Sequence, residues 1–204
     1  MDETVTDRFR TLASTSEGSY KEKGSKFLAF AFPINTEDEV KEHLKELRKK
    51  YYDARHHVYA FKLGTQGDIY RCSDDGEPSN SSGPPVLGQL NSYNLTNVLI
   101  VVIRYFGGTK LGVSGLINAY RTAAADAIEN NTIEERFEQD RFTIAFGYTV
   151  MNDVMRILKD ENPEQSNQQF DNTCRITLSI RKSEGQGLRV RLAEVEGLRI
   201  DEKV

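Results

Sequence analysis

The stretch NVLIVVIRYFGGTKLGVSGLINAY, residues 97–120, decides the fold. Its first part, Asn97–Tyr105, is an almost continuous apolar run, which is typical of a buried strand. A glycine-rich loop follows, and over Ser114–Asn130 apolar residues recur at the spacing of an amphipathic helix. The stretch therefore predicts a buried strand that leads through a loop into a helix with one apolar side.

The chain before this stretch predicts a strand, a helix and a hairpin. Lys26–Ile34 is apolar and aromatic, as in a strand. Thr36 and Glu39 form a capping-box pattern, because the threonine can accept a hydrogen bond from the third residue of a helix. Arg55–Leu63 and Asp68–Cys72 predict two strands joined by a four-residue turn that begins and ends with glycine.

A charged segment, Glu134–Asp140, interrupts the pattern, and we predict a domain boundary there. The rest of the chain predicts the order strand, helix, strand, strand, helix, strand, and its first strand covers Arg141–Val150. This βαββαβ order is typical of a ferredoxin-like sandwich. The predicted fold class is therefore α+β, with one domain over residues 1–136 and a ferredoxin-like domain over residues 137–204.

Composition excludes several classes of protein. Of the 204 residues, 38% are hydrophobic and 28% are charged, which suits a chain with a sizeable core rather than a disordered one. The formal net charge of −4 disfavours a general polyanion binder but leaves room for a local basic patch. No signal peptide or membrane span is visible, and the two cysteines lie far apart. We expect a cytoplasmic protein with reduced thiols, no cofactor and no membrane contact.

A long polar loop, CSDDGEPSNSSGPP at residues 72–85, follows the hairpin. Long loops inside compact domains are usually functional or disordered, so we expect a site where this loop meets the glycine-rich one. If the four-residue turn sets the hairpin register, His57 faces Asp74 and His56 faces Asp75. A neutral imidazole held by a carboxylate suits a general base or an oriented metal ligand. A structural bond that supports the loop is the alternative.

The polar loop also carries three carboxylates, Asp74, Asp75 and Glu77, which are candidates for binding a hard cation such as Mg²⁺. No calcium-loop pattern is present, and an ordinary Asp-Asp-Gly turn is the alternative. In an enzyme, His56 or His57 would act as the base, Asp74 would orient it, and the other two carboxylates would serve as acid or metal groups.

The glycine-rich loop predicts an anion site. Backbone N–H groups of Gly107 and Gly108 and the start of the following helix, at Ser114, attract negative charge. Arg104 and Lys110 would add positive charge. The loop matches neither of the common nucleotide-binding glycine signatures, so it specifies no nucleotide. Glycines required only for tight packing between strand and helix are the alternative.

Five segments together resemble the IMPACT/YigZ family in order and spacing. They are KGSKF (Lys23–Phe27), DARHHVYAF (Asp53–Phe61), SDDGEP (Ser73–Pro78), GPPVL (Gly83–Leu87) and VVIRYFGGTKLGVSGLINAY (Val101–Tyr120). The resemblance covers the first two-thirds of the chain. This sequence has Asn80-Ser81-Ser82 where the family usually reads Gly-Thr-Ala, and Ser114 where it usually reads Gly.

The resemblance implies an N-terminal βαβ domain of the left-handed crossover superfold, like a ribosomal-protein domain and a translation-GTPase domain. It implies a C-terminal ferredoxin-like domain similar to the last domain of elongation factor G. Eukaryotic members of the family resemble regulators of translation initiation. We therefore expect a non-enzymatic binding or regulatory protein linked to translation, contacting RNA, the ribosome or a ribosome-associated protein. The alternative is an enzyme acting on a phosphorylated or carboxylated small molecule through the His/Asp site, with Arg104 and Lys110 as the anion clamp.

Overall fold

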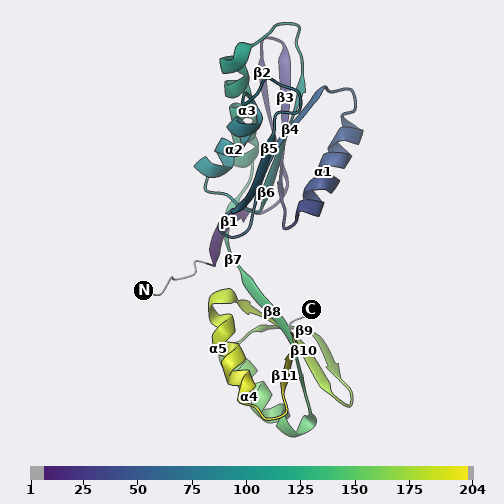
Figure 1. Cartoon of the computed structure of the whole chain (residues 1–204), viewed down its shortest axis with the longest axis vertical. Helices are drawn as coiled ribbons and strands as arrows, with labels where there is room; N and C mark the ends of the chain where they lie inside the picture. Colours follow the sequence, from purple (N-terminus) through teal and green to yellow (C-terminus); the bar gives the residue numbers. More distant parts are fainter. Residues whose placement is uncertain (1–6, 202–204) are drawn as a thin grey trace. The chain divides into compact units, whose positions relative to one another are not determined.

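The apolar stretch forms β6 (Val98–Tyr105), the central strand of a five-stranded sheet in the computed structural model, which describes residues 7–201 (Figure 1). The strand order is β2-β3-β6-β4-β5, and neighbouring strands are antiparallel. The other strands are β2 (Ser16–Glu22), β3 (Ser25–Pro33), β4 (His56–Leu63) and β5 (Ile69–Ser73). Apart from its last residue β6 is buried, because helices cover both faces of the sheet.

Helix α1 (Glu37–Lys50) covers one face of this sheet, and α2 (Gly83–Ser92) and α3 (Gly112–Glu129) cover the other (Figure 1). The alternation of side chains along each strand separates two cores. The even-numbered apolar residues of β6 pack with α2 and α3, and the odd-numbered ones pack with α1. Each face of the sheet therefore has its own hydrophobic core.

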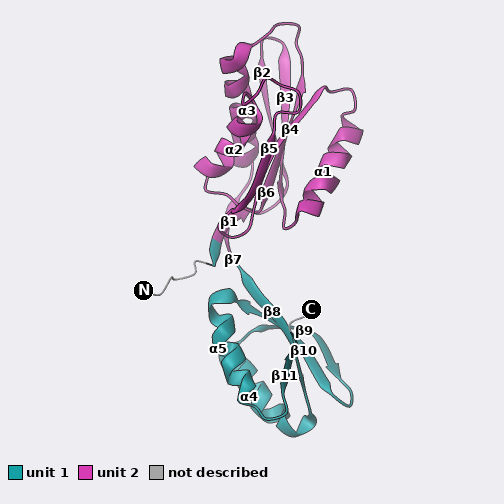
Figure 2. Cartoon of the chain, in the orientation of Figure 1, with its two compact units in different colours: residues 1–8, 137–204 teal, residues 9–136 magenta. Residues whose placement is uncertain are grey.

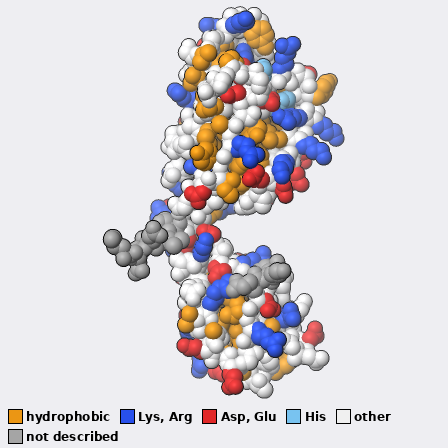
Figure 3. Space-filling view, in the orientation of Figure 1, with side chains coloured by type: hydrophobic (Ala, Val, Ile, Leu, Met, Phe, Trp, Pro, Cys, Tyr) orange, Lys and Arg blue, Asp and Glu red, His pale blue; other side chains and the backbone are white. Residues whose placement is uncertain are grey.

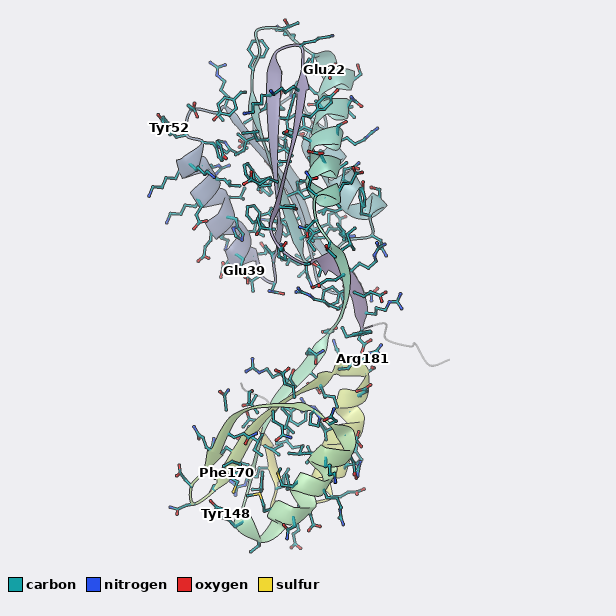
Figure 4. All side chains as sticks on the ribbon, turned by 180° about the vertical axis from the view of Figure 1, so that it is seen from behind. Glu22, Glu39, Tyr52, Tyr148, Phe170 and Arg181 are labelled. Carbon is teal, nitrogen blue, oxygen red and sulfur yellow. The ribbon has the colours of Figure 1, made fainter. Side chains whose placement is uncertain are left out.

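Helix α1 begins as its sequence predicts. The Oγ1 atom of Thr36 accepts a hydrogen bond from the N–H of Glu39 at 3.2 Å. The Glu39 carboxylate reaches back to the N–H of Asn35 at 2.8 Å, one residue before the cap. Figure 4 shows Glu39 at the first turn of the helix and Tyr52 just beyond its last turn. The capping-box prediction is therefore confirmed, with the backbone partner of the glutamate shifted by one residue.

The hairpin of β4 and β5 differs by one residue from the predicted register. Leu63 pairs with Ile69, whereas a four-residue turn would have paired it with Asp68. The connection has five residues, because Gly64 and Gly67 both adopt positive φ and the N–H of Gly67 donates to the Gly64 carbonyl at 3.0 Å. The predicted pairing of His57 with Asp74 is consequently wrong.

The chain divides into two compact units, coloured separately in Figure 2. One is Phe9–Arg136, and the other joins the described residues 7–8 to residues 137–201. Asp7 therefore belongs with the second unit instead of the expected domain over residues 1–136; its carboxylate receives two hydrogen bonds of 2.8 Å from Arg181. Both units combine helices and strands, so the fold class is α+β.

The second unit is a four-stranded sheet in the order β11-β8-β10-β9, with helices α4 and α5. Its elements are β8 (Gln139–Phe146), a 3-10 turn (Tyr148–Val150), α4 (Met151–Glu161), β9 (Glu164–Phe170), β10 (Cys174–Arg181), α5 (Lys182–Ala193) and β11 (Arg199–Asp201). The first strand ends at Phe146 rather than Val150, because the chain turns at Gly147 into the 3-10 segment. The Tyr148 hydroxyl there donates to the Phe170 carbonyl at 2.9 Å (Figure 4).

Three strands were not predicted from the sequence: β1 (Arg8–Leu12), β2 and β7 (Ile133–Phe137). Strands β1 and β7 form a separate two-stranded sheet.

On the face of the molecule shown in Figure 3, lysine and arginine side chains alternate with acidic and hydrophobic ones. That face is therefore not uniformly basic. None of the described helices is both long enough and apolar enough to cross a membrane.

Candidate functional site

The candidate site starts from a row of three side chains across the Phe9–Arg136 sheet. Arg104 on β6 pairs with Phe27 on β3 and with His56 on β4. Cross-strand partners project from the same face of a sheet, and these three share the face that α2 and α3 cover. The row lies at the end of β6, just before the chain enters the loop that leads to α3.

Arg104 forms a buried ion pair with Glu77 of the polar loop. The Arg104 Nη1 atom lies 2.6 Å from Oε1 of Glu77, and the two side chains are only 8% and 4% exposed. The hydroxyl of Tyr120, on α3, donates to the same Oε1 at 2.8 Å. Burial, reinforced by the negative charge of Glu77, raises the pKa of Tyr120 far above its usual range, so the phenol remains a donor. This network joins the sheet, the loop and α3.

The Arg104 guanidinium also lies over two aromatic rings. Its central carbon is 5.6 Å from the ring centres of Phe27 and of Phe106. The Nε atom is buried and has no hydrogen-bond partner among the described residues. Buried donors are nearly always satisfied in folded proteins, so this one needs an explanation.

Asp74 holds the start of α2. Its carboxylate accepts hydrogen bonds from the N–H groups of Asn80, Ser82 and Gly83 and from the Ser82 hydroxyl, at 2.6–3.0 Å. Burial favours a higher pKa for Asp74, but these hydrogen bonds together outweigh it and keep the pKa below its usual value. Asp74 therefore caps a helix and closes the polar loop, and it does not orient a histidine.

Asp75, rather than Asp74, is the carboxylate beside the histidines. Its Oδ2 accepts from the backbone N–H of His57 at 2.6 Å, and its Oδ1 accepts from Arg48 at 3.2 Å. The Asp75 carbonyl lies 2.9 Å from Nδ1 of His56. Asp75 has φ +41°, a conformation for which aspartate is among the better-suited residues. These contacts fit the structural alternative, in which the His–Asp arrangement supports the loop.

The two histidines point to opposite sides of β4. His56 projects toward the α2 and α3 face, as do Val58 and Ala60. His57 projects toward the α1 face and is buried. Burial lowers the pKa of His57, although the nearby charge of Asp75 partly opposes this shift. Only His56 therefore lies on the same face as Arg104.

The structure separates the three carboxylates predicted as a cation site. Asp74 binds the start of α2, Asp75 binds β4 and α1, and Glu77 binds Arg104 and Tyr120. Within residues 7–201, no three histidine, cysteine, aspartate or glutamate side chains are grouped so that they could hold a metal ion.

Gly107 allows its backbone to pack closely against the backbone of Gly24. A Cβ atom at this position would lie 1.8 Å from the Gly24 carbonyl carbon, and the Gly107 N–H donates to Ser25 Oγ at 3.2 Å. A side chain therefore cannot fit here without displacing the backbone. Gly108 and Ser114, the other two small residues predicted to bind an anion, do not line the cleft that the structure forms nearby.

That cleft has a volume of about 770 Å³ and lies between the two loops, at the start of α3. Its polar lining is Arg55, His56, Glu77, Arg104 and Lys110, and its apolar lining is Pro78, Phe106, Leu111, Val113 and Leu116, with Gly112 between them. The cleft thus brings together Arg104 and Lys110 from one predicted group and His56 and Glu77 from the other.

Three further lining residues were not predicted from the sequence: Arg55, Phe106 and Val113. Phe106 and Val113 are 57% and 54% exposed, which is unusual for large apolar side chains beside a charged cleft. The sequence did show that these two apolar residues lie in the glycine-rich loop, which was the signal that could have identified them. Such apolar residues in a polar loop either pack inward or form an exposed apolar wall, and here they form the wall.

Comparison with known proteins places most of the Phe9–Arg136 unit in one family. Residues 23–128 match the Impact N-terminal domain. The chain is 36% identical over 112 residues to the IMPACT family member YvyE of Bacillus subtilis, a match that covers 55% of this chain and 52% of that protein. It is 30% identical over 138 residues to the IMPACT family member YigZ of Escherichia coli, covering 67% of this chain and 68% of that one.

The match spans about half the length of the B. subtilis relative. A crystal structure of a hypothetical protein resembles the whole chain, with a TM-score of 0.71 and coverage of 98% of this chain and 99% of the other. The sequence identity in that comparison is 22%, so it supports the fold alone.

Proposed function

Because the chain belongs to the IMPACT family, we propose that it is a non-enzymatic regulatory protein of translation that contacts RNA, the ribosome or a ribosome-associated protein. The observation that carries this proposal is the match of residues 23–128 to the Impact N-terminal domain. Eukaryotic members of the family resemble regulators of translation initiation. The structural roles of Asp74 and Asp75 agree with a binding function, since both carboxylates are held by helix and strand backbone.

The proposal includes the finer folds of the two units. We assign residues 139–201 to the ferredoxin-like class, similar to the last domain of elongation factor G. The antiparallel strand order β11-β8-β10-β9 and the two intervening helices support this assignment. We assign the Phe9–Arg136 unit to the left-handed crossover βαβ class of ribosomal proteins. Both classes occur in proteins that bind the ribosome, which is an analogy of fold rather than of site.

The contact surface we propose is the open face of the C-terminal sheet, defined by Arg141, Arg175 and Arg199. Even-numbered residues of β8 and β10 fill the core beneath α4 and α5, so odd-numbered residues project from the opposite face. The three arginines come from three adjacent strands and are exposed. Within residues 7–201 none of them forms an ion pair.

Two of these arginines are placed to hold one phosphate. Arg175 and Arg199 both pair with Ala145, from opposite sides of β8. Two successive antiparallel pairings put their Cα atoms about 10 Å apart. A phosphate between two guanidinium groups accepts charge-assisted hydrogen bonds from both. Asp201 lines the same hollow and partly offsets the positive charge there. Because arginine–phosphate contacts release counterions, we expect binding to weaken as the salt concentration rises.

Ribosome co-sedimentation from lysate at low and high salt tests the proposal. We expect salt-sensitive association of the wild type and its loss in an Arg175→Ala/Arg199→Ala variant. The matched control is Arg156→Ala/Lys159→Ala, which removes the same charge from exposed positions on α4. Absence of association at every salt concentration would refute the translation proposal. Equal loss in both variants would place the contact elsewhere and refute the proposed surface.

A further inference from the structure

We propose that the cleft at the start of α3 is a binding site for a small organic anion, a molecule with one oxyanion group on an apolar, ring-sized body. This inference goes beyond the proposed role in translation, since it gives the Phe9–Arg136 unit a small-molecule ligand of its own. It also revises the predicted anion site. Arg104 and Lys110 remain in it, Arg55 and His56 are added, and Gly107, Gly108 and Ser114 are left out.

The charge of the cleft favours an anion. Arg55 and Lys110 line it, both are exposed, and neither forms an ion pair within the described part of the chain. The carboxylate in the lining belongs to Glu77, which already receives Arg104 and Tyr120. With Glu77 and Arg104 balancing each other, the two unpaired cations leave the cleft positive. A concave site lined by one sign of charge concentrates ligands of the opposite sign.

The position of Arg104 supports the same conclusion. Arg104 is only 7% exposed, yet its Nε atom has no hydrogen-bond partner among the described residues. A guanidinium offers five N–H donors in one plane, and the contact with Glu77 uses the Nη1 end. Arg104 lines the cleft, so its charge acts on a ligand there although the Nε atom itself is covered by protein.

The start of α3 also favours an anion in the cleft. The helix begins at Gly112, and the residue at its cap position, Leu111, provides no side-chain hydrogen bond. Lys110, Leu111, Gly112 and Val113 all line the cleft, so the first turn of an 18-residue helix borders it. Uncapped N–H groups at the start of a helix favour anions. The Arg104 side chain lines the same cleft, so the helix start is not the sole feature there that attracts an anion.

The apolar wall of the cleft favours a ligand that is apolar beyond its oxyanion. Phe106 and Val113 are more than half exposed and stand beside Leu111 and Leu116 in the lining. A bare inorganic anion would leave these surfaces in water. The volume of about 770 Å³ lies within the usual range of small-molecule sites. A ligand of this kind places its apolar ring against Phe106 and its oxyanion toward Arg55, Arg104 and Lys110. The ring then covers the apolar wall, and the oxyanion pairs with the positive charges.

Isothermal titration of the full chain with four probes tests this proposal. Phenyl phosphate and 3-phenylpropionate carry the ring and the oxyanion, 3-phenylpropanol carries the ring alone, and inorganic phosphate carries the oxyanion alone. We expect at least one of the first two to bind tenfold or more tightly than both of the last two. The preferred member of that pair identifies the oxyanion as a phosphate or a carboxylate.

Variants locate the site. Arg55→Gln/Lys110→Gln should weaken binding of the preferred probe at least tenfold, while Lys45→Gln/Lys49→Gln, which removes two exposed charges from α1, should leave it unchanged. Phe106→Ala should weaken the ring-bearing probe and leave inorganic phosphate unaffected. Lack of binding by both ring-bearing anions at 10 mM, equal binding of the neutral alcohol, or equal loss in the α1 control would overturn the proposal. Since Arg175 and Arg199 lie in the other unit, their variant should bind the probe normally, so this test is independent of ribosome association.

Discussion

The Glu77→Gln substitution is a direct test of whether the polar loop is part of the folded core. It keeps the size of the side chain and leaves an amide oxygen that Tyr120 can still donate to, but it removes the charge opposite Arg104. Both side chains of the ion pair are more than nine-tenths buried, so water replaces the lost carboxylate poorly. Removal of one partner from a buried pair typically costs about 3–5 kcal/mol.

The expected loss is measured by urea unfolding, followed through the amide signals of β6, which report the Phe9–Arg136 unit alone. With a urea dependence of about 2 kcal/mol per molar, a loss of about 4 kcal/mol lowers the midpoint by about 2 M. The matched control is Glu37→Gln, which removes one partner of a largely exposed pair with Arg71 at 3.7 Å. Exposed pairs contribute about 0–1 kcal/mol. If Glu77→Gln shifts the midpoint no more than Glu37→Gln does, the ion pair does not stabilise the fold and our account of the loop is wrong.

Three further predictions concern residues that are buried or lie in packed elements. Because burial lowers the pKa of His57 below 6.5, the unfolded chain binds a proton more readily than the folded one as the pH falls through 6.5. The stability due to neutral His57 is therefore complete above pH 6.5 and is lost below it. As the pH is lowered from 8 to 5, the melting temperature should fall less steeply for His57→Leu than for the wild type. Parallel curves for the two proteins would contradict this. Gly107→Ala should destabilise the protein by about 1–3 kcal/mol, since its Cβ would meet the Gly24 backbone. Gly88 lies in α2, and apart from its own helix and chain neighbours no atom lies within 4 Å of a Cβ built there. Gly88→Ala should therefore stabilise the protein by about 0.5–1 kcal/mol. Denaturant titration measures both changes, and a stabilising Gly107→Ala or a destabilising Gly88→Ala would contradict them.

The elements predicted correctly from the sequence are those set by local chemistry. The apolar run of β6, the helical spacing of α3 and the Thr36 cap all depend on residues close together in the chain. Strand β2 was missed because it is a polar edge strand with little apolar alternation. Its Gly18 lies against the backbone of α3, where a Cβ would be 2.3 Å from the nitrogen of Ala127. That close approach depends on a contact between distant segments, which a single sequence does not reveal.

The hairpin register illustrates the same limit. The Gly64 carbonyl accepts a hydrogen bond at 2.6 Å from Thr96, a residue 32 positions away, and this bond helps to fix a five-residue turn. Local turn rules favoured four residues. The one-residue difference brings Asp75 rather than Asp74 to the histidines, which changes the interpretation of the site. A local error of one residue was therefore enough to misassign the carboxylate at the candidate site.

The three carboxylates of the polar loop explain why the cleft is positive. Asp74 is held by the start of α2, Asp75 by β4 and Arg48, and Glu77 by Arg104 and Tyr120. Had any of them faced the cleft without a partner, it would have cancelled the charge of Arg55 or Lys110. Because each already has its own partners, an acidic loop borders a cleft whose unpaired charges, on Arg55 and Lys110, are positive. The net charge and the acidic composition of the polar loop therefore suggest the wrong sign for this site, whereas Arg104 and Lys110 beside the glycine-rich loop suggest an anion site. The pairing of distant residues reconciles the two.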